Sequence, residues 1–181
     1  NNVNDPLFAT KGIRWSLEGS WTFSLDKTSN SFSNIKSELC FFIPVKISLP
    51  TTLCFRSGGA SNFDSFEFFQ SNMLGGYSYP LQQGEENIRG FRRNRFAGRS
   101  TLFQNAEFRT RLFNFVKLGQ LGVLGYGDIG RAWMDGEISN TWHSGYGGGV
   151  WLAPLNKLVL TFTYSLSKED QLFNLHMGFL F

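Results

Sequence analysis

The segment LFNLHMGFLF (residues 172–181) alternates apolar and mixed residues at the C-terminal end of the sequence. Successive side chains of an extended chain point to opposite faces, so residues 173, 175, 177, 179 and 181 are predicted to share one apolar face. We expect a strand that runs to Phe181, with its apolar face against lipid and the terminal ring in an interfacial aromatic girdle. The alternative is a C-terminal core strand of a soluble sandwich.

The composition favours the lipid-facing interpretation. The chain has 20 Phe, 5 Trp, 5 Tyr and 20 Gly among 181 residues, yet its mean hydropathy is only −0.18. No segment reaches the roughly 18 consecutive apolar residues that a transmembrane helix needs, and the most apolar run, residues 39–45, contains Pro44. Many aromatic residues without long apolar runs are typical of a transmembrane β-barrel, and the length permits one domain over residues 1–181.

Alternating patterns and turn residues predict eight strands and their connections. The strands are expected at residues 12–25, 33–45, 46–61, 100–113, 118–133, 144–153, 157–165 and 172–181. The connections alternate between short turns (44–50, 113–118 and 154–156) and longer segments (26–32, 62–98, 134–143 and 166–171). Outer-membrane barrels have short periplasmic turns and long outer loops. The sequence therefore predicts an all-β, antiparallel transmembrane barrel in the bacterial outer membrane, with both chain ends on the periplasmic side.

Several function classes receive little support from the sequence. An arginine cluster, residues 89–99, could bind nucleic acid, but no nucleic-acid fold motif accompanies it. His143 and His176 have no recognisable nucleophile partner, and the glycines at 147–149 do not lead from a strand into a helix as a phosphate loop would. No CxxC pair or His/Cys cluster indicates zinc. We therefore expect no catalytic, cofactor or metal residues. The start at Asn1, without Met, suggests a removed signal or a shortened chain.

Cys40 and Cys54 are the two cysteines of the chain. Both are predicted on the face opposite the apolar one, on neighbouring strands and at similar distances from the turn between them. They could form a cross-strand disulfide in the oxidising cell envelope. A pair of buried free thiols remains equally compatible, because strand register can slip by a residue in such a weakly patterned hairpin.

Two carboxylates are predicted to point into the barrel. The alternation places Glu107 and Asp128 on the inward faces of neighbouring strands. A buried carboxylate pair needs a cation, and the planar fork of arginine can bind two carboxylates at once. We therefore expect the loop at residues 62–98 to fold back into the barrel and Arg89 to dock on Glu107 and Asp128. The alternative is that Glu107 pairs with Arg109 or Arg111 along the barrel wall, without loop insertion.

Short motifs in a consistent order give the chain a family resemblance. Residues 88–91, Ile-Arg-Gly-Phe, resemble the (V/I)-R-G-(F/Y) signature of the polypeptide-transporting outer-membrane barrels. This superfamily, also called the bacterial surface antigen family, includes BamA, TamA and the two-partner secretion transporters. Four further motifs resemble its conserved steps: DPLFATKG (5–12), LGG (74–76), NAEFR (105–109) and YGDIG (126–130). Phe181 resembles the family's C-terminal signal.

The resemblance implies both a fold and residue roles. In the family, the signature arginine, here Arg89 followed by Gly90 and Phe91, pairs inside the lumen with the Glu and Asp that match Glu107 and Asp128. Phe181 would be read by the assembly machinery. The chain would be the C-terminal half of a sixteen-stranded barrel. Departures are the replacement of Asn and Pro by residues 5 and 9, the longer segment 77–87, and the absence of the first half-barrel and of POTRA repeats.

Three functional hypotheses follow. The first is an assembly or translocation barrel, whose weak seam opens to template client strands. The second is a small self-closed eight-stranded anchor, which would hold an enzyme domain preceding Asn1. The third is a homodimer of two half-barrels. The expected partners are outer-membrane lipid and, depending on the hypothesis, client polypeptides, a second half-barrel or a second copy. Small inward residues, at 122, 161, 163 and 178, favour a barrel wider than eight strands.

Overall fold

The computed structural model describes residues 1–25, 30–76, 86–115, 118–138 and 140–181. In this part the chain forms antiparallel β-sheets and no α-helix. Nine strands form one sheet in the order β1-β2-β3-β4-β7-β8-β9-β10-β11. Their bounds are β1 (Asn2–Val3), β2 (Gly12–Thr22), β3 (Phe32–Lys46), β4 (Pro50–Asp64), β7 (Ser100–Phe115), β8 (Gly119–Trp133), β9 (His143–Pro154), β10 (Leu160–Ser167) and β11 (Gln171–Met177). A second, two-stranded sheet pairs β5 (Asn72–Leu74) with β6 (Phe96–Gly98), and the 3-10 helix η1 (Phe68–Gln70) precedes it.

The alternating sequence places apolar side chains on the convex face of the main sheet. On β3, Phe41 and Ile43 are exposed on this face. The alternate residues, Cys40 and Phe42, are buried on the concave face. The other long strands repeat this arrangement, so the exposed large hydrophobic residues form a belt around the sheet. Such a belt is the surface that a barrel presents to lipid.

No helix within the described residues is long and apolar enough to cross a membrane.

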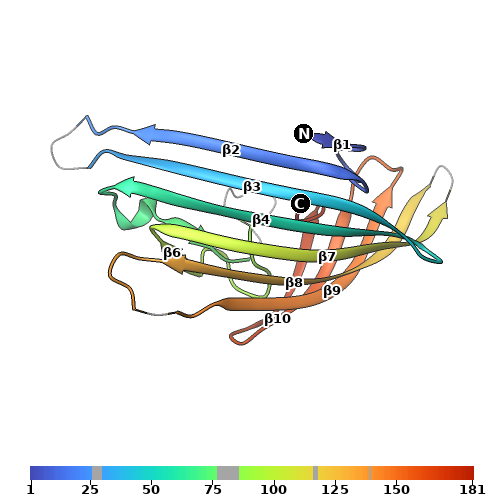
Figure 1. Ribbon diagram of the computed structural model, residues 1–181. Coiled ribbons are helices and arrows are strands. Elements are labelled where there is room, and N and C mark those ends of the chain that lie inside the picture. Colours follow the sequence, from blue (N-terminus) through green and yellow to red (C-terminus); the bar gives the residue numbers. More distant parts are fainter. Residues whose placement is uncertain (26–29, 77–85, 116–117, 139) are drawn as a thin grey trace.

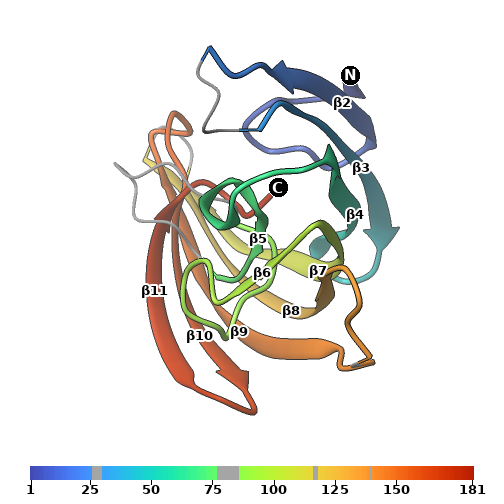
Figure 2. The same cartoon turned by 90° about the vertical axis from the view of Figure 1, so that its left-hand side faces the viewer.

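The main sheet is curved but open. Figure 2 shows it curling from β2 around to β11, with β5, β6 and the C-terminal residues on its concave side, here called the lumen. Within the described residues, β11 pairs only with β10, and β2 pairs with β3 and with the two residues of β1. The self-closed form of the predicted eight-stranded barrel is therefore not observed, because β2 and β11 do not pair with each other and, apart from the short contact with β1, their outer edges are unpaired in the described part.

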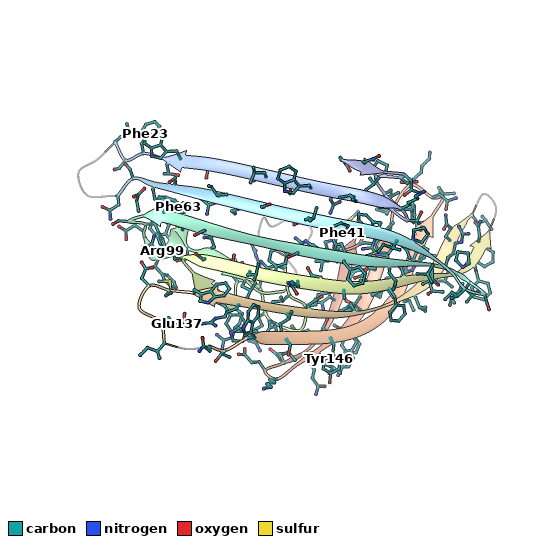
Figure 3. All side chains as sticks on the ribbon, viewed as in Figure 1. Phe23, Phe41, Phe63, Arg99, Glu137 and Tyr146 are labelled. Carbon is teal, nitrogen blue, oxygen red and sulfur yellow. The ribbon has the colours of Figure 1, made fainter. Side chains whose placement is uncertain are left out.

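The two ends of the sheet differ as the connection lengths predict. Short turns join β3 to β4 and β9 to β10 at one end, on the right in Figure 1, and longer connections lie at the other end. Figure 3 places Phe23, Phe63, Arg99 and Glu137 together near the long-loop end. The predicted alternation is therefore present except between β10 and β11, where residues 168–170 form a connection as short as the β3–β4 turn. Residues 26–29, 77–85, 116–117 and 139 of the connections lie outside the described part.

The prediction for the last strand is wrong in its final residues. Strand β11 ends at Met177 rather than at Phe181. Gly178 has φ +104°, a backbone conformation that glycine adopts readily, and its N–H donates to the Val159 carbonyl at 2.8 Å. The chain then turns into the lumen, so the Phe181 ring is 8% exposed and packs in a buried cluster rather than in an interfacial girdle.

Three other differences from the sequence prediction are smaller. The strand expected from residue 46 begins at Pro50. The ninth strand, β1, is a two-residue pairing that is too short to give a periodic signal. The segment 62–98, expected to be mostly irregular, contains β5, β6 and η1, while its residues 77–85 lie outside the described part.

Candidate functional site

The site is the long loop between β4 and β7, of which the structure describes residues 65–76 and 86–99; its strands β5 and β6 lie in the lumen. Figure 2 shows its strands β5 and β6 enclosed by the curve of the main sheet. Its apolar side chains form a buried cluster with the sheet, made of Leu74, Ile88, Phe91 and Phe103. Burial of such side chains is worth about 1.5–3 kcal/mol each, so the loop is held by packing as well as by polar contacts.

Arg89 is the polar centre of the docked loop and is 1% exposed. Its backbone N–H and its Nε both donate to Asp128 Oδ2, at 2.8 and 2.7 Å, and its Nη2 donates to Asp128 Oδ1 at 2.8 Å. Its Nη1 donates to Glu107 Oε2. The guanidinium also lies 3.4 Å from the centroid of the Tyr126 ring. The structure thus brings together Arg89, Glu107 and Asp128, the three residues that the sequence placed in one site.

Two strands supply the carboxylates at neighbouring positions. Glu107 on β7 is paired with Tyr126 on β8, and Asp128 lies two residues further along β8, on the same inward face. Glu107 also accepts a hydrogen bond from Arg109 Nε at 2.6 Å. The alternative pairing along the wall is therefore present together with the loop docking, because one carboxylate serves both arginines.

The rest of the signature fits closely around the arginine. Gly90 has φ +88°, and a Cβ atom there would lie 2.9 Å from the carbonyl oxygen of Leu166. Phe91 is 3% exposed, and its ring centroid lies 5.3 Å from that of Phe96. Phe96 in turn stacks on His143 with 3.5 Å between ring centroids. The glycine therefore permits the close approach to β10, and the phenylalanine anchors the loop among aromatic rings.

Amides of the loop and the wall complete the docking. The Asn87 side chain accepts from the Gly75 N–H at 2.8 Å and donates to the Met73 carbonyl at 3.0 Å. Asn105, inward on β7, donates to the Asn87 carbonyl at 2.6 Å. Because these groups are buried, each bond also removes the cost of an unsatisfied polar atom. The Leu-Gly-Gly step and the signature are thus joined directly, although residues 77–85 between them are outside the described part.

The inward face of β9 leaves space for the loop because it carries no side chains there. A Cβ atom built on Gly145 would overlap the Arg89 carbonyl oxygen, and one on Gly147 would lie 2.6 Å from the Tyr126 hydroxyl. By contrast, a Cβ on the outward Gly127 meets nothing within 4 Å. The glycines of β9 are therefore part of the site.

Exposed ion pairs hold the loop at the outer end of the sheet. Arg92 Nε lies 2.8 Å from Asp170, and Arg95 Nε lies 2.7 Å from Glu169, both in the connection between β10 and β11. The Arg92 side chain is 76% exposed. Solvent and salt weaken such pairs, which contribute about 0–1 kcal/mol. The arginine cluster thus faces carboxylates of the same chain.

The C-terminal tail (residues 178–181) reaches the same ion-pair cluster from the other side. Arg109 Nη2 donates to the Phe181 carbonyl oxygen at 2.7 Å. The Arg109 guanidinium also lies 4.0 Å from the Phe179 ring centroid and 5.3 Å from that of Phe181. Phe181 packs in turn against Phe42. Sequence analysis assigned Phe181 to the outer surface and therefore missed this contact.

The N-terminal motif lies beside the tail. Asp5 Oδ1 accepts hydrogen bonds from the N–H groups of Leu7 and Phe8, at 2.8 and 3.0 Å. The turn directs Phe8 toward the Trp151 ring, 6.2 Å away between centroids, and toward Phe179, 6.4 Å away. The segment that replaces the family's usual Asn with Asp5 therefore still forms a tight turn that packs inside the sheet.

The two cysteines are buried free thiols, so the disulfide considered from the sequence does not form. In the register, Cys54 lies opposite Phe42, and Cys40 lies opposite Arg56. The thiols are therefore offset by two residues instead of being directly opposed. Both pack in the cluster that contains Phe181, which makes them part of the seat of the tail.

Tyr126, Asn105 and Gly145 contact the docked loop, and the sequence assigned no role to them. For Arg109 it offered only the pairing with Glu107. Tyr126 and Asn105 each lie two residues before a predicted carboxylate, so strand alternation alone could have placed them on the inward face. The double contact of Arg109 depends on the inward tail, which the pattern did not predict. Within the described residues, no group of three or more His, Cys, Asp or Glu side chains could hold a metal ion.

Comparison with known proteins agrees with this geometry. The model of the Omp85 superfamily domain matches residues 1–181. A search of the curated proteins finds no match. Members of the superfamily are bacterial outer-membrane proteins that insert or translocate polypeptides. The match covers the curved antiparallel sheet, the apolar belt and the signature arginine that docks in the lumen. This chain belongs to the Omp85 superfamily.

Proposed function

We propose that this chain forms part of the wall of a bacterial outer-membrane barrel that inserts or translocates polypeptides, with further strands completing the ring. The observation that carries the proposal is an open sheet with a loop pinned inside it. In the described part the outer edge of β11 is unpaired, and the outer edge of β2 is unpaired except where β1 pairs with Gly12 and Ile13. Unpaired edges accept further strands.

The lumen supports a wider ring. Several inward positions on β9 and β10 are small: Thr163 is paired with Gly149 and Ser165 with Gly147, whereas Thr161 lies opposite the larger Trp151. An eight-stranded barrel has an interior just wide enough for side chains, whereas this wall accommodates the long loop in addition. The lipid-facing partner is the outer membrane, and the strand-pairing partners are a second half-barrel, a second copy or a client polypeptide.

Site-specific photocrosslinking tests this proposal. A photoreactive amino acid replaces Trp21 on β2 or Phe173 on β11, which are 76% and 85% exposed and lie on the two edge strands. The matched control is Tyr146 on β9, which is 61% exposed but lies on a strand paired on both sides. Newly made envelope proteins are pulse-labelled, and adducts are followed during a chase.

Transport predicts adducts with several newly made polypeptides at Trp21 or Phe173, which disappear during the chase and are absent at Tyr146. A passive membrane anchor predicts at most one permanent adduct at each edge. Equal, short-lived adducts at all three positions would contradict the assignment of the edges as polypeptide-binding sites.

A further inference from the structure

We propose that Arg109 couples the docking of the long loop to the seating of the C-terminal tail, so that release of one loosens the other. The relay runs from Asp128 through Arg89, Glu107 and Arg109 to the Phe181 carbonyl oxygen. It joins a loop near the outer end of the sheet to the chain that follows the edge strand β11. This inference stands on contacts within the chain and does not depend on what the barrel transports.

The first step of the relay is a shared carboxylate. Glu107 Oε2 accepts from Arg89, and Glu107 Oε1 accepts from Arg109 Nε at 2.6 Å. The side chains of Arg89, Glu107, Asp128 and Arg109 are 1%, 1%, 0% and 6% exposed. Two guanidinium groups therefore balance two carboxylates away from water. Withdrawal of one arginine leaves one buried carboxylate charge without a cation. The remaining three side chains must then rearrange to neutralise it.

The second step is the grip of Arg109 on the tail. Nη2, which lies on the same edge of the guanidinium as the Nε that binds Glu107, donates to the Phe181 carbonyl oxygen at 2.7 Å, and the guanidinium carbon lies 4.0 Å from the Phe179 ring centroid. The planar fork fixes the direction of both contacts at once. Loss of Arg89 leaves Glu107 Oε2 without its donor, and a rotation of the Arg109 guanidinium to reach that oxygen as well would remove its donor from Phe181.

The third step is the release of the tail, which makes few polar contacts other than the bond from Arg109. In the described residues, its contacts besides the Arg109 bond are the Gly178 N–H to the Val159 carbonyl and the Thr161 hydroxyl to the Gly178 carbonyl. Both involve the first residue of the tail. The end of the tail is thus held by the Arg109 bond and by ring packing, which includes the Arg56 guanidinium 5.8 Å from the Phe181 ring centroid.

The test measures tail exposure when the loop is released. All variants of the full polypeptide, extracted from its membrane, carry Leu180→Cys. The rate at which maleimide labels this cysteine reports tail seating, and mass spectrometry of the labelled peptides separates it from Cys40 and Cys54. Arg89→Met releases the loop, Arg109→Met breaks the relay, and the two are combined in a double variant. Protease cleavage between residues 65 and 99 reports loop release.

Arg111→Met is the matched control, because Arg111 is also inward on β7 but contacts Gln120 and not the relay. Heat-modifiable gel migration establishes that each variant is folded. A variant that fails this criterion is replaced by its lysine counterpart, which keeps the charge but loses the fork.

Coupling predicts at least a tenfold faster labelling of Leu180→Cys in Arg89→Met and in Arg109→Met, and faster loop cleavage in both. The double variant is expected to label no faster than the faster single variant, and Arg111→Met within twofold of the parent. A cleaved loop with unchanged labelling in Arg89→Met would overturn the proposal. Multiplying effects in the double variant would also overturn it, because they would show two independent contacts.

Discussion

Replacement of Arg89 by Met tests the central ion pair most directly. The change keeps the backbone N–H bond to Asp128 but removes the two side-chain bonds to that carboxylate. Glu107 retains Arg109, so Asp128 is the group left without a cation. Breaking a buried pair by removing one partner costs about 3–5 kcal/mol. At about 1.4 kcal/mol per tenfold change, the unfolding equilibrium shifts by roughly two to more than three orders of magnitude.

The assay is urea unfolding of the barrel in detergent micelles, followed by tryptophan fluorescence and gel migration, with the free energy taken from midpoint and slope. Arg92→Met is the matched control from the same loop. The Arg92 pair with Asp170 is exposed, so its loss is expected to cost no more than about 1 kcal/mol.

A second substitution sharpens the reasoning. Asp128→Asn in the Arg89→Met background removes the charge left uncompensated, and the free energy of unfolding is expected to recover by more than half. Two results would refute the argument: equal losses for Arg89→Met and Arg92→Met, or no recovery in the double variant. Either would mean that packing of the loop, and not the buried charge balance, determines its docking.

Three further predictions concern the wall, the tail and the thiols. Gly145→Ala is expected to expose the long loop to protease, since its Cβ would overlap a loop carbonyl oxygen, whereas Gly127→Ala has open space and should leave cleavage unchanged. Phe181→Ala should lower the free energy of unfolding by about 3 kcal/mol, because the ring is buried; a loss of membrane levels without loss of stability would instead favour a pure targeting role. Cys40 and Cys54 should resist maleimide until urea unfolds the barrel, and mass spectrometry of the folded protein showing rapid double labelling would contradict their burial.

Strand alternation predicted the main sheet well because one face of each strand is apolar and the other is not. Phe108 is outward and Glu107 inward, as period two requires. The same rule, combined with the need of buried carboxylates for a cation, led to Arg89 before any geometry was known. Local chemistry was sufficient there because the three residues carry complementary charges.

The tail shows where the pattern fails. Residues 179 and 181 continue the alternation of β11, but Gly178 reverses the chain and directs both rings inward. A period-two pattern cannot distinguish a lipid-facing ring from one that packs on Arg109, because both are apolar. The sequence left the pairing of Cys40 and Cys54 open for a related reason, since the register of a hairpin is determined by its turn and not by the strand pattern.

The glycines that line β9 make the site unevenly sensitive to substitution. A survey that shortens side chains one at a time will find nothing to remove at Gly145 or Gly147 and will pass over this strand. A survey that enlarges residues will identify it, because an added carbon meets the Arg89 carbonyl oxygen at Gly145, and the Tyr164 carbonyl oxygen and Tyr126 hydroxyl at Gly147. Natural variation at these two positions should be confined to glycine, whereas the outward positions of the same strand, such as Tyr146 and Val150, carry large side chains.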